Sequence, residues 1–187
     1  MKQLFRVLAI AMVLAGLGAT VAGAATLEEK RKQVRDMTRE TLEKLYELKP
    51  EAKKQVETSA GYAVFSNWGM KILVLGGGQG KGMAVSNLNR KETFMNMVEL
   101  SGGLGFGAKK FKVVFLFANE AALKDFTEKG WQFGGRATVA ATDGSSGGAY
   151  QGAVSVSPGI WMYEITEKGI ALEVTLKGAK FSKNDLN

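Results

Sequence analysis

Two kinds of hydrophobic pattern divide the chain at Gly61. Before Gly61, apolar residues recur with the spacing of one face of a helix. After it, they form short runs that are separated by glycine or polar turns. Beyond the first 24 residues, every glycine lies at or after Gly61. The pattern therefore predicts a helical segment followed by an antiparallel β domain.

The helical segment is predicted to contain two helices. The first begins at the capping box Thr26-Leu27-Glu28-Glu29 and ends near Lys49. Its apolar stripe consists of Leu27, Val34, Met37, Leu42, Leu45 and Leu48. Pro50 begins the second helix, because a proline at this position lacks only an N–H that the helix does not need. The inner side of that helix is predicted to be Ala52, Val56 and Ala60.

A ridge of arginines borders the first apolar stripe, at Arg31, Arg35 and Arg39. A helix lying on a membrane surface uses such a ridge. Acidic residues share the polar side, however, so its net charge is close to zero. A solvated helix packed on a sheet is the favoured interpretation.

The β domain is predicted to contain ten short strands. They lie near residues 62–66, 70–76, 80–87, 92–100, 103–107, 112–117, 132–141, 149–157, 160–166 and 170–176. Strand carboxylates such as Glu92 and Glu164 are predicted to face solvent. Many consecutive strands without long crossovers indicate a sheet that curls into a barrel or a sandwich. The fold class is therefore α+β, with the N-terminal helical segment packed on a curled antiparallel sheet.

The centre of the chain predicts one short helix inserted between strands. The apolar run from Val113 to Phe117 is typical of a strand that is buried on both faces. Asn119 is a suitable N-cap, and Gly130 is the expected C-terminal stop in a left-handed conformation.

A glycine-rich stretch from Gly76 to Gly82 suggests a phosphate-binding loop but does not fit one. The position for the first glycine of a phosphate loop is Leu75, and Gly82 stands where a serine or threonine is needed. The stretch is instead interpreted as a tight hairpin with Gln79 at its tip.

The first 24 residues have the features of a secretory signal. Lys2 and Arg6 precede an apolar segment that is too short to cross a bilayer, and Ala22-Gly23-Ala24 forms a small-residue cleavage site. We expect cleavage after Ala24 and a periplasmic or secreted protein. Residues 25–60 are then the helical segment and 61–187 the β domain, and the two form one globular unit.

Composition excludes several kinds of chemistry. The chain has no histidine and no cysteine, so it has no Ser-His-Asp or Cys-His machinery and no ordinary zinc site. We expect no enzymatic activity, no metal and no cofactor. The net charge of +7 favours anionic partners such as phospholipid headgroups, and it is too dispersed to indicate nucleic acid.

A group of basic residues around Phe111 is the candidate site for lipid phosphate. Strand alternation puts Phe111 on the face of Val113, so the lysines on either side of it point the opposite way. The candidate phosphate-binding residues are Lys81, Lys109, Lys110, Lys112 and Arg136. The alternative is that the lysines of this group keep an edge strand soluble and unpaired.

An ordered set of motifs resembles one known family. The motifs are Gly61-Tyr62-Ala63-Val64-Phe65, the glycine-rich hairpin, Gly103-x-Gly105-x-Gly107, Phe115-Leu116-Phe117, the segment from Phe126 to Gly135, and the segment from Tyr163 to Gly178. Together they resemble the bacterial, exported branch of the SYLF domain family. The resemblance implies binding of phosphoinositides or other anionic lipids, and in eukaryotic members also binding of actin.

Two other functions remain open at this point. The apolar runs at Ile72–Leu75 and Val113–Phe117 are consistent with a carrier that encloses an apolar ligand inside the sheet. The glycine-rich edges and the amphipathic helix are consistent with an envelope scaffold that binds other proteins. The sequence names no particular protein partner.

Overall fold

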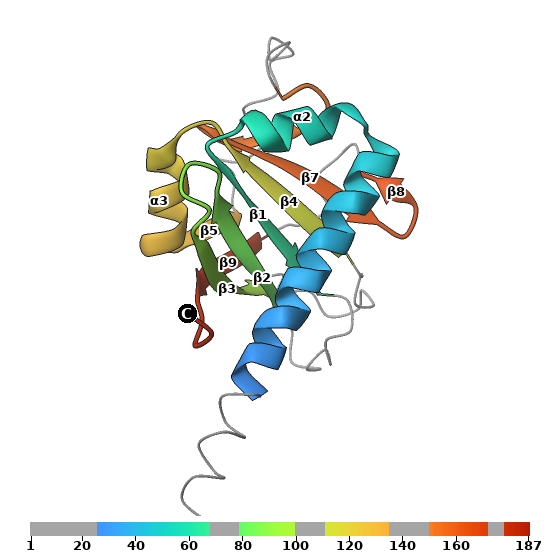
Figure 1. The fold of residues 1–187 in the computed structure, drawn as a ribbon. Coiled ribbons are helices and arrows are strands. Elements are labelled where there is room, and N and C mark those ends of the chain that lie inside the picture. Colours follow the sequence, from blue (N-terminus) through green and yellow to red (C-terminus); the bar gives the residue numbers. More distant parts are fainter. Residues whose placement is uncertain (1–25, 68–78, 100–110, 135–149, 172–177) are drawn as a thin grey trace, which may run out of the picture.

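The computed structural model describes residues 26–67, 79–99, 111–134, 150–171 and 178–187. These residues form one antiparallel sheet with helices on both faces (Figure 1). The N-terminal helix, residues 26–48, crosses one face of the sheet diagonally and leads into α2 (Glu51–Thr58). The third helix, α3 (Glu120–Glu128), packs on the opposite face. The α+β prediction is confirmed.

The described strands are β1 (Gly61–Ser66), β2 (Gln79–Ser86), β3 (Glu92–Glu99), β4 (Phe111–Phe117), β5 (Trp131–Gly134), β6 (Val154–Ser157), β7 (Ile160–Thr166), β8 (Gly169–Ile170) and β9 (Gly178–Lys183). Their order in the sheet is β5-β9-β3-β2-β1-β4-β7-β6, and β8 pairs with β7. Every pair is antiparallel. Among the described strands the arrangement is therefore a single sheet rather than a two-sheet sandwich.

Aromatic side chains fill the face that carries α3, which we call the α3 face. The rings of Phe65, Phe115, Phe126, Trp131 and Phe181 lie with centroids 4.7–6.2 Å apart. Gly82 has no side chain because the ring of Phe65 and the carbonyl of Val64 occupy the space that a Cβ atom would need. The ring of Phe65 therefore packs directly against the backbone of β2 at Gly82.

The opposite face, which we call the N-helix face, is covered by the N-terminal helix and α2. Leu45, Ala52 and Val56 from these helices pack on a cluster that includes Val114 of β4 and Tyr163 of β7. Nearer its start, the N-terminal helix places Val34 against Met83, Val85 and Phe94. The predicted apolar stripe therefore faces the sheet, except for Leu48, which is 38% exposed.

The predicted boundaries of α3 are confirmed. The side chain of Asn119 accepts a hydrogen bond from the backbone N–H of Ala122 at 2.9 Å, as an N-cap does. Gly130 follows the last turn with φ of +71°, the left-handed conformation in which glycine is favoured. The strand predicted at 112–117 is β4, and its residues Val113–Phe117 are all buried.

Two predictions about the β domain were wrong, and one strand was missed. Glu164 is 2% exposed instead of facing solvent, because the register places it opposite Val113 on the α3 face. Gln79 does not lie at a hairpin tip, since it is already in β2 and pairs with Val98. Strand β9 was not predicted, because only Ala179 and Phe181 provide its apolar alternation.

Other differences are smaller. Strand β6 begins at Val154 rather than near residue 149, and Ala60 lies beyond the end of α2. The strands predicted at 70–76 and 103–107, and the later parts of those at 132–141 and 170–176, fall outside the described residues.

Candidate functional site

The register of the sheet brings two of the predicted lysines together. Lys81 of β2 and Lys112 of β4 both pair with Ser66 of β1, one on each side. Because neighbouring strands are about 4.8 Å apart, the backbones of the two lysines are separated by about 10 Å. Directly paired residues point to the same face, so both side chains lie on the N-helix face.

These lysines belong to a longer line of polar residues across the sheet. On the other side of Lys81, Asn96 and then Ser182 continue the same register. We call these five residues the polar row: Ser182, Asn96, Lys81, Ser66 and Lys112. The neighbouring register is the apolar set Val64, Met83 and Val114. The polar row therefore marks the margin of the core beneath the helices.

Burial within the polar row differs between its members. Ser66 is 4% exposed, whereas Lys81 and Lys112 are half-buried. A half-buried lysine packs its aliphatic stem on apolar neighbours and carries its ammonium group outward. The row can thus present two positive charges at the edge of the covered core.

The prediction about the direction of Lys112 is confirmed. Phe111, Val113, Phe115 and Phe117 all lie in the core on the α3 face, and Lys112 points the other way. The sequence did not show that this other face is the one covered by the N-terminal helix. The remaining candidate residues, Lys109, Lys110 and Arg136, lie outside the described residues.

The arginine ridge of the N-terminal helix ties the helix to the rest of the protein. Arg31 donates a hydrogen bond through Nε to the carbonyl oxygen of Leu186 at 2.7 Å. Arg35 donates to Glu92 of β3 at 2.9 Å and to Glu28 at 2.7 Å, and its guanidinium lies 5.4 Å from the ring centre of Phe94. The structure thus agrees with a packed helix rather than one free to lie on a membrane.

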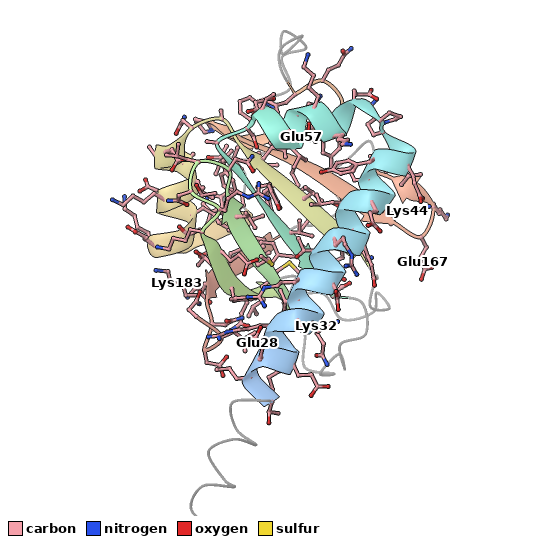
Figure 2. All side chains as sticks on the ribbon, in the orientation of Figure 1. Glu28, Lys32, Lys44, Glu57, Glu167 and Lys183 are labelled. Atoms are coloured by element: carbon pink, nitrogen blue, oxygen red, sulfur yellow. The ribbon has the colours of Figure 1, made fainter. Side chains whose placement is uncertain are left out.

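These ionic contacts also change the acidity of the helix carboxylates. The hydrogen bond from Arg35 holds the pKa of Glu28 below its ordinary value. The hydrogen bond from Lys32 lowers the pKa of Asp36 in the same way. Figure 2 shows charged side chains along the outer side of this helix, including Glu28, Lys32 and Lys44. Much of the positive charge there is paired with carboxylates.

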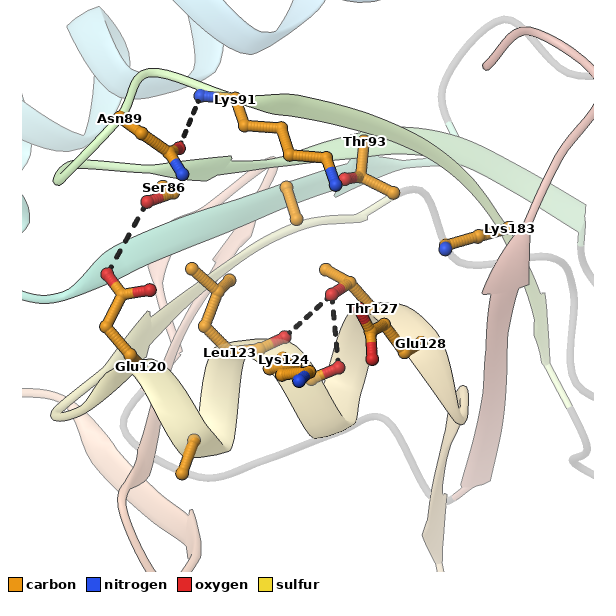
Figure 3. Close-up of a pocket in the computed structure, with 12 residues that line it drawn as sticks. Ser86, Asn89, Lys91, Thr93, Glu120, Leu123, Lys124, Thr127, Glu128 and Lys183 are labelled. Carbon is orange, nitrogen blue, oxygen red and sulfur yellow. Dashed lines mark hydrogen bonds between the residues drawn. The ribbon is translucent and has the colours of Figure 1, made fainter.

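A pocket of about 270 Å³ lies on the α3 face, between α3 and the strands β2, β3 and β9. Its sheet wall includes Lys91, Thr93 and Lys183, and its helix wall includes Glu120 and Thr127 (Figure 3). Ala84 and Ala121 also line the pocket, and their small side chains leave space between helix and sheet. The pocket was not predicted, because its residues come from three separate parts of the sequence.

The described residues contain neither a metal-ligand cluster nor a membrane-spanning helix. Within the described ranges, no three acidic, histidine or cysteine side chains gather closely enough to hold a metal ion. None of the described helices is both long and apolar enough to cross a bilayer.

The sequence matches known proteins in two comparisons. Residues 98–187 match the family model described as "Ysc84: Las17-binding protein actin regulator", which is the SYLF domain. The chain is also 30% identical over 156 residues to Beta cell expansion factor A of Aeromonas veronii. The chain belongs to the SYLF family. The match covers 83% of this chain and 58% of that relative, so the chain spans a little over half of the relative's length.

Membership of the SYLF family indicates the general class of function. It supports, in general terms, a lipid-binding or actin-regulating domain, and the family is one of binding modules rather than enzymes. The matched region begins at Val98 and includes β4 with Lys112 and α3, but not Lys81, Lys91 or Thr93.

Proposed function

We propose that this SYLF protein is a non-enzymatic module that binds anionic phospholipid in the periplasm. The observation that carries the proposal is the pairing of Lys81 and Lys112 with Ser66, which puts two ammonium groups on the same margin of the sheet. Lys109 and Lys110 directly precede this part of β4 in the sequence. A basic cluster of this kind fits the phosphate groups of a membrane surface.

The expected strength of this binding follows from the charges. Each lysine near an anionic bilayer contributes about 1 kcal/mol, and salt screens the attraction beyond about 8 Å at physiological ionic strength. Three or four lysines therefore give measurable adhesion that weakens as salt rises. Phosphoinositide-like headgroups and phosphatidylglycerol carry the same phosphate chemistry, so the test uses the latter.

The experiment measures binding of the purified protein to phosphatidylglycerol vesicles at low and high salt. The Lys109/Lys110/Lys112→Ala variant should bind more weakly than the wild type at low salt. A Lys53/Lys54/Lys129→Ala variant is the matched control, because it removes the same charge from exposed positions on α2 and at the end of α3. Equal binding by the wild type and the first variant, or binding that ignores salt, would contradict the proposal.

The periplasmic location rests on the leader sequence. Cleavage after Ala24 should release a mature chain that begins at Ala25. Intact-mass measurement of the protein recovered from the cell envelope tests this directly. A mass that still includes residues 1–24 would contradict it.

Protein binding is the second candidate function, and it is favoured by the family description as a Las17-binding actin regulator. If this protein is exported, its SYLF domain would bind a partner other than Las17. The carrier alternative has no support in the described part of the α3 face. There, the rings of Phe65, Phe115 and Phe181 occupy the centre of the sheet and contact one another.

A further inference from the structure

The pocket under α3 contains lysines that have no carboxylate partner. Lys91, Lys124 and Lys183 line it, and within the described part of the chain none of their ammonium groups forms an ion pair or a hydrogen bond. Lys129, which caps the C-terminal end of α3 outside the pocket, differs from these lysines. It forms an ion pair with Asp125 at 2.8 Å. The pocket thus holds three lysines beside two glutamates, and within the described residues none of these lysines forms an ion pair.

A threonine on the sheet wall adds a polar group to the same pocket. Thr93 is 7% exposed and lines the sheet wall of the pocket, beside Lys91 (Figure 3). Its hydroxyl forms no hydrogen bond with any described residue. Its pairing partner on β2 is Ala84, whose side chain has no polar atom. The Thr93 hydroxyl is therefore open to the pocket, where it can form a hydrogen bond with an oxygen of a ligand.

The helix wall carries Lys124, but unlike the sheet wall it also carries carboxylates. Glu120 and Glu128 line it, and Glu120 accepts a hydrogen bond from the Ser86 hydroxyl at 3.5 Å. The Thr127 hydroxyl donates to the carbonyl oxygen of Leu123 at 3.0 Å, so its lone pairs are left to accept. Carboxylate and hydroxyl oxygens on this side are suited to accept hydrogen bonds from the hydroxyl groups of a ligand.

The two walls together specify the ligand's chemistry. Ammonium groups and an unpaired hydroxyl on the sheet wall fit a phosphoryl group, since lysine binds phosphate as a point charge. Acceptors on the helix wall fit a polyol. We propose that this pocket binds the phosphate ester of a small polyol, either as a free molecule or as the headgroup of a phospholipid. The headgroup form rests on the proposed function, and the free form does not.

An exposed leucine beside the pocket separates the two sources. Leu88 is 77% exposed in the turn between β2 and β3, next to Asn89, which lines the pocket. An apolar side chain in this position gains contact with acyl chains only when the ligand is part of a bilayer. Leu88 should therefore matter for vesicles and not for a soluble phosphate ester.

The first experiment titrates the purified protein with glycerol 3-phosphate in a calorimeter. The Lys91→Gln/Lys183→Gln variant should bind at least about 10-fold more weakly, since each charged hydrogen bond is worth about that factor. Thr93→Val should weaken binding several-fold, and Lys91→Arg/Lys183→Arg should retain most of it. Lys129→Gln is the matched control and should bind like the wild type. Thermal melts establish that each variant is folded.

The second experiment repeats the series with phosphatidylglycerol vesicles, using phosphatidylcholine vesicles as the neutral reference. For a headgroup site, Leu88→Ser and the Lys91/Lys183 variant both lose vesicle binding, and Leu88→Ser still binds glycerol 3-phosphate. Binding of glycerol 3-phosphate without vesicle binding supports the free form and contradicts the proposed function. If folded pocket variants bind both probes like the wild type, or the wild type binds neither, the pocket proposal is overturned. If only the Lys109/Lys110/Lys112 variant loses vesicle binding, the proposed function is supported and the pocket is not the headgroup site.

Discussion

The two faces of the sheet are both apolar, but they are built from different aromatic residues. The α3 face is packed with phenylalanine rings that have no polar atom, including Phe65, Phe115 and Phe181. All four tyrosines of the chain lie on the N-helix face, at Tyr46, Tyr62, Tyr150 and Tyr163. The difference follows from what covers each face.

On the N-helix face, α2 and the turn before β6 provide polar partners for a buried tyrosine. The Tyr163 hydroxyl donates to Oε1 of Gln55 in α2 at 2.6 Å, and Nε2 of Gln55 donates to the carbonyl oxygen of Gln151 at 3.0 Å. This network joins α2, β7 and the turn before β6. Buried hydroxyl groups need such partners, so tyrosine is placed where backbone and amide groups come close. The buried tyrosines of the N-helix face therefore make its stability sensitive to alkaline pH.

The largest predicted loss of stability comes from a substitution on the α3 face. Phe115 is fully buried, and its ring lies 5.2 Å from that of Phe181 and 5.6 Å from those of Phe126 and Trp131. Phe115→Ala should lower the free energy of unfolding by about 3–5 kcal/mol, because it removes a ring and leaves a cavity. Urea denaturation measures this, with the exposed Leu88→Ala as a control expected within about 0.5 kcal/mol. A loss of under about 1 kcal/mol would show that this face contributes little to stability.

The second prediction concerns alkaline pH and the N-helix face. Burial raises the pKa of Tyr46 and of Tyr163 to about 12, from an ordinary value of 10. The folded state keeps these protons longer than the unfolded state, so their contribution is complete below pH 10. It is lost as pH rises from about 10 to about 12.

Replacing Tyr163 tests whether its buried phenol causes part of this loss of stability at alkaline pH. Tyr163→Phe has no phenolic proton, so its stability should fall less steeply over this range, by about 1–2 kcal/mol between pH 10 and pH 12. Urea unfolding at several pH values measures the difference, and lysine titration is common to both proteins. Tyr150→Phe is the control, because Tyr150 is only half-buried and should give a smaller change. Parallel pH profiles for wild type and Tyr163→Phe would contradict the prediction.

The smallest predicted effect is a gain in stability. It comes from comparing two buried threonines of the N-terminal helix. Thr38 is 5% exposed, and its hydroxyl forms no hydrogen bond with the described residues. Thr38→Val keeps the shape and removes that hydroxyl, so it should raise stability by about 0.5–1 kcal/mol. Thr41 is fully buried, but its hydroxyl donates to the carbonyl oxygen of Met37 at 2.7 Å. Thr41→Val should therefore be neutral or destabilising, and equal effects of the two substitutions would refute the distinction.

Much of the fold could be predicted from the sequence because the signals are local. The Asn119 cap, the Gly130 stop and the apolar run of β4 are each properties of a few adjacent residues, and the structure has all three. The direction of Lys112 follows from strand alternation in the same way. These features depend on backbone geometry that neighbouring residues impose on one another.

The tertiary structure decided what the strands pair with and which face each helix covers. Strand β9 lies between β3 and β5, far from both in sequence, and it supplies Lys183 to the pocket and Ser182 to the polar row. Glu164 was predicted to face solvent, yet it is buried because it pairs with Val113 on the covered α3 face. Alternation tells which residues share a face, but burial depends on the elements that pack against that face. The sequence by itself therefore determined the elements and the class of fold, while register and packing brought Lys81 to Lys112 and created the pocket under α3.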